Sequence, residues 1–169
     1  MSARVVELDL ETGVYTRVAF ERELAFAVRV ARRAAQPCSL LVVDVDDFQA
    51  LRDVRGDLAA DSCLEALAQR ISAESSGAGP IGRLGSDTFA LLLPGWALPR
   101  ACALADRLRG ATRADRCVMA TVSVGVAAPV TAWLNNHHVQ MVGEAALRQY
   151  DGFVRAAAKR RAASGASAP

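Results

Sequence analysis

Arg83-Leu84-Gly85-Ser86-Asp87-Thr88-Phe89-Ala90-Leu91-Leu92-Leu93-Pro94 is the stretch that decides the fold of this chain. The segments at 81–84 and 89–93 flank a short polar turn at 85–88, and this pattern predicts two strands joined by that turn. Directly before them, the segment 72–80 is rich in Ser, Gly and Ala and ends in Pro80, so it is predicted to be a loop.

Helices and strands alternate along the rest of the chain. A nearly continuous apolar run at 38–45 suits a central strand buried on both faces. Thr16 can cap a helix that runs to about Ala34. Further helices are expected at about 47–54, from near Ala60, from Pro99 and at 140–161, with a strand of alternating apolar residues at 118–127. This order predicts an α/β sandwich, with a central sheet of roughly five strands flanked by helices.

The composition narrows the classes of function. In 169 residues with a net charge of +2, one domain is expected and no nucleic-acid partner is implied. No apolar run approaches the roughly 18 residues that a membrane span needs, so a cytoplasmic protein without membrane insertion is expected. The cysteines are widely separated and are predicted to be reduced core residues: Cys38, Cys63, Cys102 and Cys117.

Four motifs, in the same order and at similar spacings, resemble those of the GGDEF family, the diguanylate cyclases. They are the opening motif at 9–17, the Asp44-Val45-Asp46-Asp47-Phe48 motif followed by Asp53, Gly56 and Asp61, the signature Gly85-Ser86-Asp87-Thr88-Phe89, and the strand at 121–127. The family signature reads Gly-Gly-Asp/Glu-Glu-Phe. The resemblance implies a degenerate GGDEF domain at 9–161, after a lead segment at 1–8 and before a tail at 162–169 that is expected to be disordered.

The family joins two GTP molecules into cyclic di-GMP, each molecule held by one protomer of a dimer, and the reaction uses Mg²⁺. Asp44 matches the first metal carboxylate of the family, and Asp87 matches the acidic third position of the signature. The resemblance therefore implies residual Mg²⁺ binding at Asp44 and Asp87, supported by the phosphates of the nucleotide. Asp46 is a candidate for a structural pairing instead. A plainer interpretation is that Asp44 and Asp46 only end a strand and begin a loop.

Other positions depart from the family pattern. Thr88 replaces the second signature carboxylate, and a hydroxyl cannot serve as a general base near neutral pH. Ser86 replaces a glycine that the backbone uses to approach phosphate. Gln49 replaces a lysine, and the alignment of the last helix puts Asp151 where a second phosphate-neutralising lysine belongs. Fewer positive charges would therefore face a triphosphate.

The guanine pocket is predicted to be vestigial. Asp61 matches the family's acceptor for guanine, whereas Arg52 stands in place of the Asn that reads the base. One hypothesis is that Arg52 reaches Asp61 and closes the pocket with an ion pair; the alternative is an exposed arginine at a helix end. Ser76 and Gly79 occupy the positions of the family's inhibitory Arg-x-x-Asp motif, so feedback binding of cyclic di-GMP is not expected.

These features lead to three hypotheses about function. The first is a catalytically inactive GGDEF-like domain that acts as a regulatory or protein-interaction module in bacterial cyclic di-GMP signalling. Its expected partners are another signalling protein and a second copy of the chain in a homodimer, and no cofactor is required. The second is a non-catalytic sensor of GTP, with Mg²⁺ accompanying the nucleotide. The third is a weak diguanylate cyclase that relies on Asp44, Asp61 and Asp87.

Overall fold

We describe residues 7–127 in a computed structural model of the chain. The expected last helix at 140–161, the position of Asp151 and the tail at 162–169 lie outside the described residues. So does most of the lead segment at 1–8.

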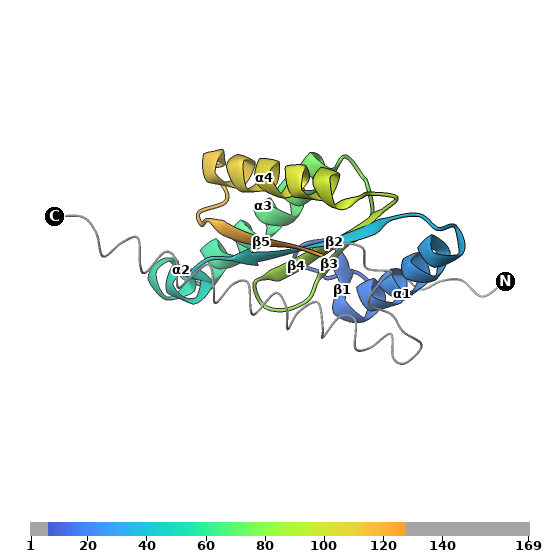
Figure 1. The fold of residues 1–169 in the computed structure, drawn as a ribbon. Helices are drawn as coiled ribbons and strands as arrows, with labels where there is room; N and C mark the ends of the chain where they lie inside the picture. Colours follow the sequence, from blue (N-terminus) through green and yellow to red (C-terminus); the bar gives the residue numbers. More distant parts are fainter. Residues whose placement is uncertain (1–6, 128–169) are drawn as a thin grey trace.

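A mixed five-stranded sheet lies at the centre of the described part of the chain (Figure 1). Its order is β1-β3-β4-β2-β5. The strands are β1 (Tyr15–Thr16), β2 (Cys38–Val45), β3 (Ile81–Arg83), β4 (Thr88–Pro94) and β5 (Val122–Ala127). β1 and β3 are parallel, while β3–β4, β4–β2 and β2–β5 are antiparallel. The signature stretch thus forms the β3–β4 pair, and the expected α/β sandwich with a five-stranded sheet is confirmed.

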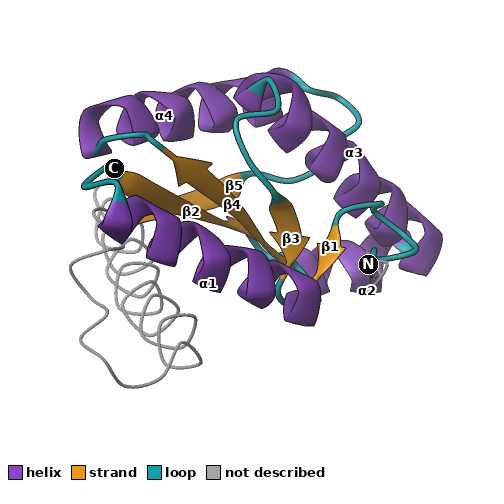
Figure 2. Ribbon diagram, turned by 90° about the vertical axis from the view of Figure 1, so that its right-hand side faces the viewer, coloured by secondary structure: helices purple, strands orange, loops and turns teal. Residues whose placement is uncertain are grey.

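Helices cover both faces of this sheet. They are α1 (Arg17–Arg33), α2 (Phe48–Arg55), α3 (Asp57–Ser75) and α4 (Leu98–Ala114). Figure 2 shows α3 and α4 on one side of the sheet and α1 on the other. Because side chains alternate along a strand, Leu41 and Val43 of β2 pack with α3 and α4, whereas Leu40 and Val42 pack with α1. Two apolar cores result.

The termini of α1 and α4 follow from local chemistry. The Thr16 side chain accepts the N–H of Ala19 at 3.4 Å, so Thr16 caps α1 as its sequence context predicts. Pro99 lies in the first turn of α4, where its missing N–H has no helical partner to lose. Both starts agree with the sequence analysis.

The position of α3 departs from the prediction. The helix begins at Asp57, before the predicted start near Ala60. The prediction missed this first turn because its exposed residues show no apolar periodicity. It also extends through 72–75, which was expected to be loop. Ser75 is buried there, and its hydroxyl donates to the carbonyl of Ser72 at 3.1 Å, so small polar residues complete the last turn. Ser76, in the left-handed region at φ 50°, ends the helix.

Two further expectations need correction. β5 begins at Val122, so residues 118–121 precede the strand, although Val118 is buried. Cys38 and Cys63 are buried as predicted, but Cys102 and Cys117 are exposed. Cys102 is on the outer face of α4, between the buried positions Ala101 and Leu104, where residue composition alone does not show which way a small side chain points.

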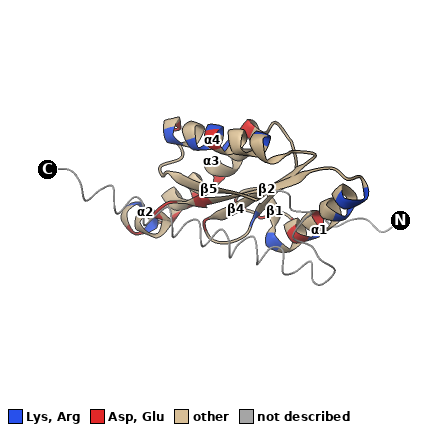
Figure 3. Ribbon diagram, viewed as in Figure 1, with Lys and Arg blue, Asp and Glu red and all other residues tan. Residues whose placement is uncertain are grey.

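Charged residues occur on several helices of the described part of the chain. Figure 3 shows Arg residues on α1, α2 and α4, with Asp and Glu residues among them. Within residues 7–127, no helix is both long enough and apolar enough to cross a membrane.

Candidate functional site

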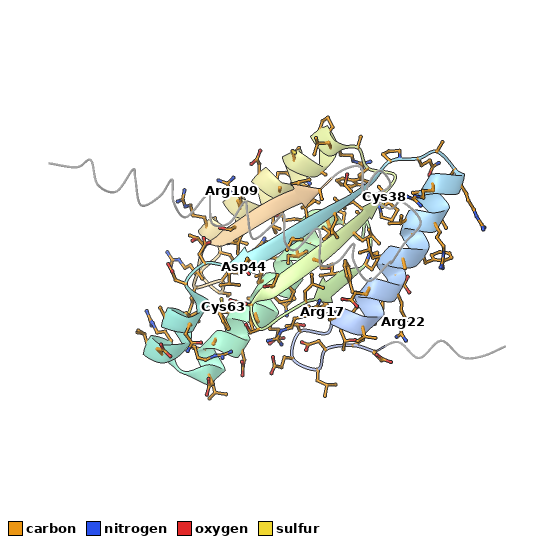
Figure 4. The ribbon with its side chains drawn as sticks, turned by 60° about the horizontal axis from the view of Figure 1, so that its bottom comes forward. Arg17, Arg22, Cys38, Asp44, Cys63 and Arg109 are labelled. Carbon is orange, nitrogen blue, oxygen red and sulfur yellow. The ribbon has the colours of Figure 1, made fainter. Side chains whose placement is uncertain are left out.

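The register of the sheet brings the Asp44 motif and the signature together. Asp44 near the end of β2 pairs directly with Thr88 at the start of β4. Beside this pair, the N–H of Val45 donates to the carbonyl of Asp87 at 3.1 Å. Figure 4 shows Asp44 toward the α2 end of β2, with Cys38 at the opposite end of that strand. The signature turn therefore lies beside the strand end that carries Asp44.

Two hydroxyl groups contact the carboxylates of Asp44 and Asp87, which we call the acid pair. Thr88 Oγ1 donates to Asp44 Oδ1 at 2.8 Å and lies 3.5 Å from Asp87 Oδ1. Ser86 Oγ donates to Asp87 Oδ1 at 2.9 Å. Asp44, Asp87 and Thr88 are half-buried, whereas Ser86 is exposed. Both hydroxyls belong to the residues that depart from the family signature.

Arg83 holds the signature turn against the N-terminal turn of the domain. Its guanidinium donates to the carbonyls of Gly85 at 3.2 Å and Ser86 at 2.9 Å. The same group pairs with Asp9 at 3.1 Å and with Glu11. Only 13% of the Arg83 side chain is exposed, so this arginine bridges the two turns from a largely buried position.

The environment of Asp9 fixes its charge. Partial burial acts to raise the pKa of Asp9, but hydrogen bonds from Thr12 and Arg83 outweigh burial and hold the pKa below its ordinary value of 3.8. Asp9 accepts both the N–H of Thr12 at 3.0 Å and its hydroxyl at 2.6 Å. The sequence analysis missed the Arg83 contacts; the only available signal was an arginine two residues before the signature.

Asp46 has the structural role that the sequence analysis considered for it. Its carboxylate accepts the hydroxyls of Thr121 at 2.5 Å and Ser123 at 2.6 Å. Its N–H donates to the carbonyl of Thr121 at 2.9 Å. Asp46 therefore fastens the end of β2 to the start of β5, next to the acid pair.

The proposed ion pair between Arg52 and Asp61 is wrong. Arg52 Nε instead lies 3.6 Å from the Asp57 carboxylate across the α2–α3 corner, and the guanidinium stacks 4.9 Å from the Phe48 ring centroid. The corner itself turns at Gly56, whose φ of 83° favours glycine. At 3.6 Å no hydrogen bond forms, so the buried Arg52 Nε has no hydrogen-bond partner. Asp61 is half-buried and has no hydrogen-bond or ion-pair partner within residues 7–127.

The positions expected to neutralise phosphate carry no cation here. Gln49 Nε2 donates to Asp53 Oδ1 at 2.8 Å along the exposed face of α2. In the described part of the chain, no group of three or more His, Cys, Asp or Glu side chains is placed to hold a metal ion. The acid pair offers two carboxylates, each already accepting a hydroxyl, so these donors alone do not fit a complete Mg²⁺ centre.

The position of the family's inhibitory motif is also constrained by the backbone. A Cβ added at Gly79 would lie 2.0 Å from the Leu92 carbonyl oxygen. An acidic side chain at position 79 therefore requires a local shift of the chain. Absence of feedback binding by cyclic di-GMP remains a prediction.

The family assignment follows from comparison with known proteins. A sequence model described as "Diguanylate cyclase, GGDEF domain" matches residues 6–149. The chain belongs to the GGDEF family. The matched range contains all four motifs on which the resemblance was based.

Curated relatives agree with this assignment. The domain is 33% identical over 87 residues to the probable diguanylate cyclase DgcC of Escherichia coli strain K12. The alignment covers 52% of this chain and 24% of DgcC. This chain spans roughly a quarter of the length of the first curated relatives that it matches.

Solved GGDEF structures share the fold. The GGDEF domain of FimX from Pseudomonas aeruginosa matches with a TM-score of 0.78 and 27% identity, covering 89% of this chain and 95% of that chain. The GGDEF domain of DgcB from Caulobacter crescentus, in complex with c-di-GMP, matches with a TM-score of 0.78 and 23% identity. The match covers 93% of this chain and 92% of that chain, and it supports the fold alone. Diguanylate cyclase SiaD from Pseudomonas aeruginosa, in complex with its activator SiaC, matches with a TM-score of 0.73 and 25% identity. The match covers 90% of this chain and 58% of that chain.

Proposed function

We propose that this GGDEF domain is catalytically inactive and acts as a regulatory or protein-interaction module in cyclic di-GMP signalling. The observation that carries the proposal is the contact between Thr88 and Asp44. A hydroxyl, and not a carboxylate, stands at the second acidic position of the signature, and its proton is donated to Asp44 at 2.8 Å. A threonine in this arrangement cannot accept a proton from an attacking 3′-hydroxyl near neutral pH.

The charge balance around a triphosphate supports the same proposal. Phosphoryl-group chemistry depends on positioning and on cations that stabilise the developing charge. Gln49 is neutral and is engaged by Asp53 on α2. The loss of one cationic hydrogen bond to phosphate costs about 1.5–3 kcal/mol. The domain would therefore bind and activate GTP poorly, even where the fold is intact.

A protein partner is the expected mode of action for such a domain. SiaD, a structural neighbour, is a diguanylate cyclase crystallised in complex with its activator, the protein SiaC. By analogy, we propose another signalling protein as the partner of this chain. Homodimerisation is a second expectation from the same family.

The test is formation of cyclic di-GMP from GTP and Mg²⁺ by purified protein. We expect no product from the natural sequence. A variant that restores the family pattern, S86G/T88E with Gln49→Lys and Arg52→Asn, is the positive comparison, because a gain of product would locate the deficit in these positions. Product from the natural sequence that disappears in Asp87→Ala would contradict the proposal and favour a weak cyclase.

A second candidate function has its own support at Asp61. This half-buried carboxylate has no hydrogen-bond or ion-pair partner within residues 7–127, so it remains available to accept hydrogen bonds from a base. Arg52 pairs with Asp57 and does not block Asp61. These contacts support a non-catalytic sensor of guanine nucleotides as the alternative.

Calorimetry separates the two functions. Titration of GTP with Mg²⁺ into the natural protein and into Asp61→Ala should give binding heat only if the sensor hypothesis holds, and the heat should vanish in the variant. Asp106→Ala is a control, since it removes an exposed carboxylate of α4 that lies outside the four motifs. Absence of heat at millimolar nucleotide would exclude the sensor.

A further inference from the structure

We infer that the hydroxyls of Ser86 and Thr88 take the place of a divalent cation at the acid pair, so that the signature turn is held without Mg²⁺. This inference rests on the proposed loss of catalysis, since a domain that no longer turns over GTP need not keep a metal centre. It concerns the acid pair itself and not the nucleotide.

The fold forces the two carboxylates together. Asp44 and Thr88 are cross-strand partners, and the Val45 N–H bond to the Asp87 carbonyl holds the next residue of the turn at the same strand end. Both carboxylates contact one atom, Thr88 Oγ1, at 2.8 Å and 3.5 Å. Two like charges held this close repel each other, and a half-buried site screens them less than bulk water does. Some positive or proton-donating group must offset the repulsion.

Each carboxylate of the acid pair accepts a hydroxyl from the signature turn. A hydroxyl has a single proton to donate. The shorter distance assigns the Thr88 proton to Asp44, and Ser86 supplies the proton to Asp87 at 2.9 Å. Hydrogen bonds to ionised carboxylates are stronger than neutral ones. Each member of the acid pair therefore has its own donor from within the signature turn.

The same substitutions weaken the attraction for a cation. The family pattern places acidic residues at both the third and fourth positions of the signature, in addition to the residue matching Asp44. Here the fourth position is Thr88, so one negative charge is lost. Mg²⁺ needs near-octahedral oxygen coordination and gives up its water reluctantly. No third acidic, His or Cys ligand is placed to join the acid pair within residues 7–127.

The test compares thermal unfolding in EDTA with unfolding in ~10 mM MgCl₂ at matched ionic strength, without nucleotide. The natural protein should unfold at the same temperature in both. Thr88→Glu restores a third carboxylate; it should unfold at a lower temperature than the natural protein in EDTA, and Mg²⁺ should raise its midpoint by about 3–6 °C. In the control D44N/T88E the carboxylate count returns to two, and Mg²⁺ should have no effect.

Direct metal binding gives a second measurement, made first on the natural protein. Mn²⁺ titration followed by electron paramagnetic resonance should show no tight site in the natural protein. A tight Mn²⁺ site that is lost in Asp87→Asn, or a Mg²⁺-dependent rise in midpoint equal to that of Thr88→Glu, would overturn the inference. Because no nucleotide is present, either result leaves the proposed inactivity to be judged by the product assay alone.

Discussion

Arg83 is the residue on which the geometry of the signature turn depends most. It donates to two carbonyls of that turn and pairs with Asp9 and Glu11 of the N-terminal turn. Burial acts to lower the pKa of Arg83, but its bonds to Glu11 and Asp9 raise the pKa above its ordinary value, so the guanidinium stays charged. The acid pair thus depends on a cation that does not contact it.

Replacing Arg83 with Met should destabilise the domain by about 2–4 kcal/mol, because two carboxylates and two turn carbonyls lose a largely buried partner. Urea unfolding followed by circular dichroism measures the change in free energy. Arg17→Met is the matched control. Its ion pair with Glu21 is largely exposed on α1, so its loss should cost no more than about 0.5 kcal/mol. Equal effects for the two variants would show that Arg83 is not a structural bridge.

Elements with a continuous apolar pattern were predicted well, and elements defined by a few polar contacts were not. The apolar run of β2 and the Thr16 cap were read correctly, because each depends on residues adjacent in sequence. The first turn of α3 was missed because it is exposed and carries no periodicity. The partner of Arg52 was also missed, since the choice of Asp57 over Asp61 depends on how the chain turns at Gly56.

The site shows the same division between local and long-range information. The resemblance to the GGDEF family implied that Asp44 and Asp87 lie together at one metal site. No sequence pattern, however, indicated that Thr88 would donate to Asp44, 44 residues away, or that Arg83 would reach Asp9, 74 residues away. These contacts depend on the register of β2 with β4 and on the position of the N-terminal turn.

The contact between α1 and β3 gives a prediction at the scale of these elements. A Cβ at Gly82 would lie 2.5 Å from Phe20, which is 1% exposed beneath the strand. Gly82→Ala should therefore destabilise the domain by about 1–3 kcal/mol through overpacking. Gly110→Ala in α4 meets no atom within 4 Å and should stabilise by about 0.5–1 kcal/mol. Urea unfolding measures both, and a neutral Gly82→Ala would contradict the packing of α1 on β3.

At the scale of the whole molecule, two apolar cores on either side of one sheet carry the fold, and the polar site lies at a strand end. Val43 of β2 packs with α3 and α4, and Val42 packs with α1. Asp44 follows Val43 in β2. Because side chains alternate along a strand, Asp44 lies on the same side of the sheet as Val42, which is the α1 side. The signature turn can therefore change its chemistry without disturbing either core, which explains how the fold persists while the signature departs from its family.

The free energy of unfolding should fall at low pH. The pKa of Asp115 is held below 3.8 by its hydrogen bond from Arg70, and that of Asp9 is also lowered. A carboxyl group whose pKa is lower in the folded than in the unfolded chain stabilises above the unfolded pKa, and the stabilisation is lost as pH falls through the folded pKa. Urea unfolding should therefore show a falling free energy below about pH 4. In Asp9→Asn the fall should be smaller; an unchanged fall would contradict the role given to Asp9.

The loss of catalysis is tested most directly by measuring cyclic di-GMP made from GTP and Mg²⁺ over a wide range of concentrations of the natural protein. A reaction between two nucleotide-loaded protomers has a rate that grows with the square of protein concentration while the protein is mostly monomeric. We predict no product above the protein-free control at any concentration. Product whose rate grows in that way would contradict the account, because Thr88 and Gln49 would then be compatible with turnover.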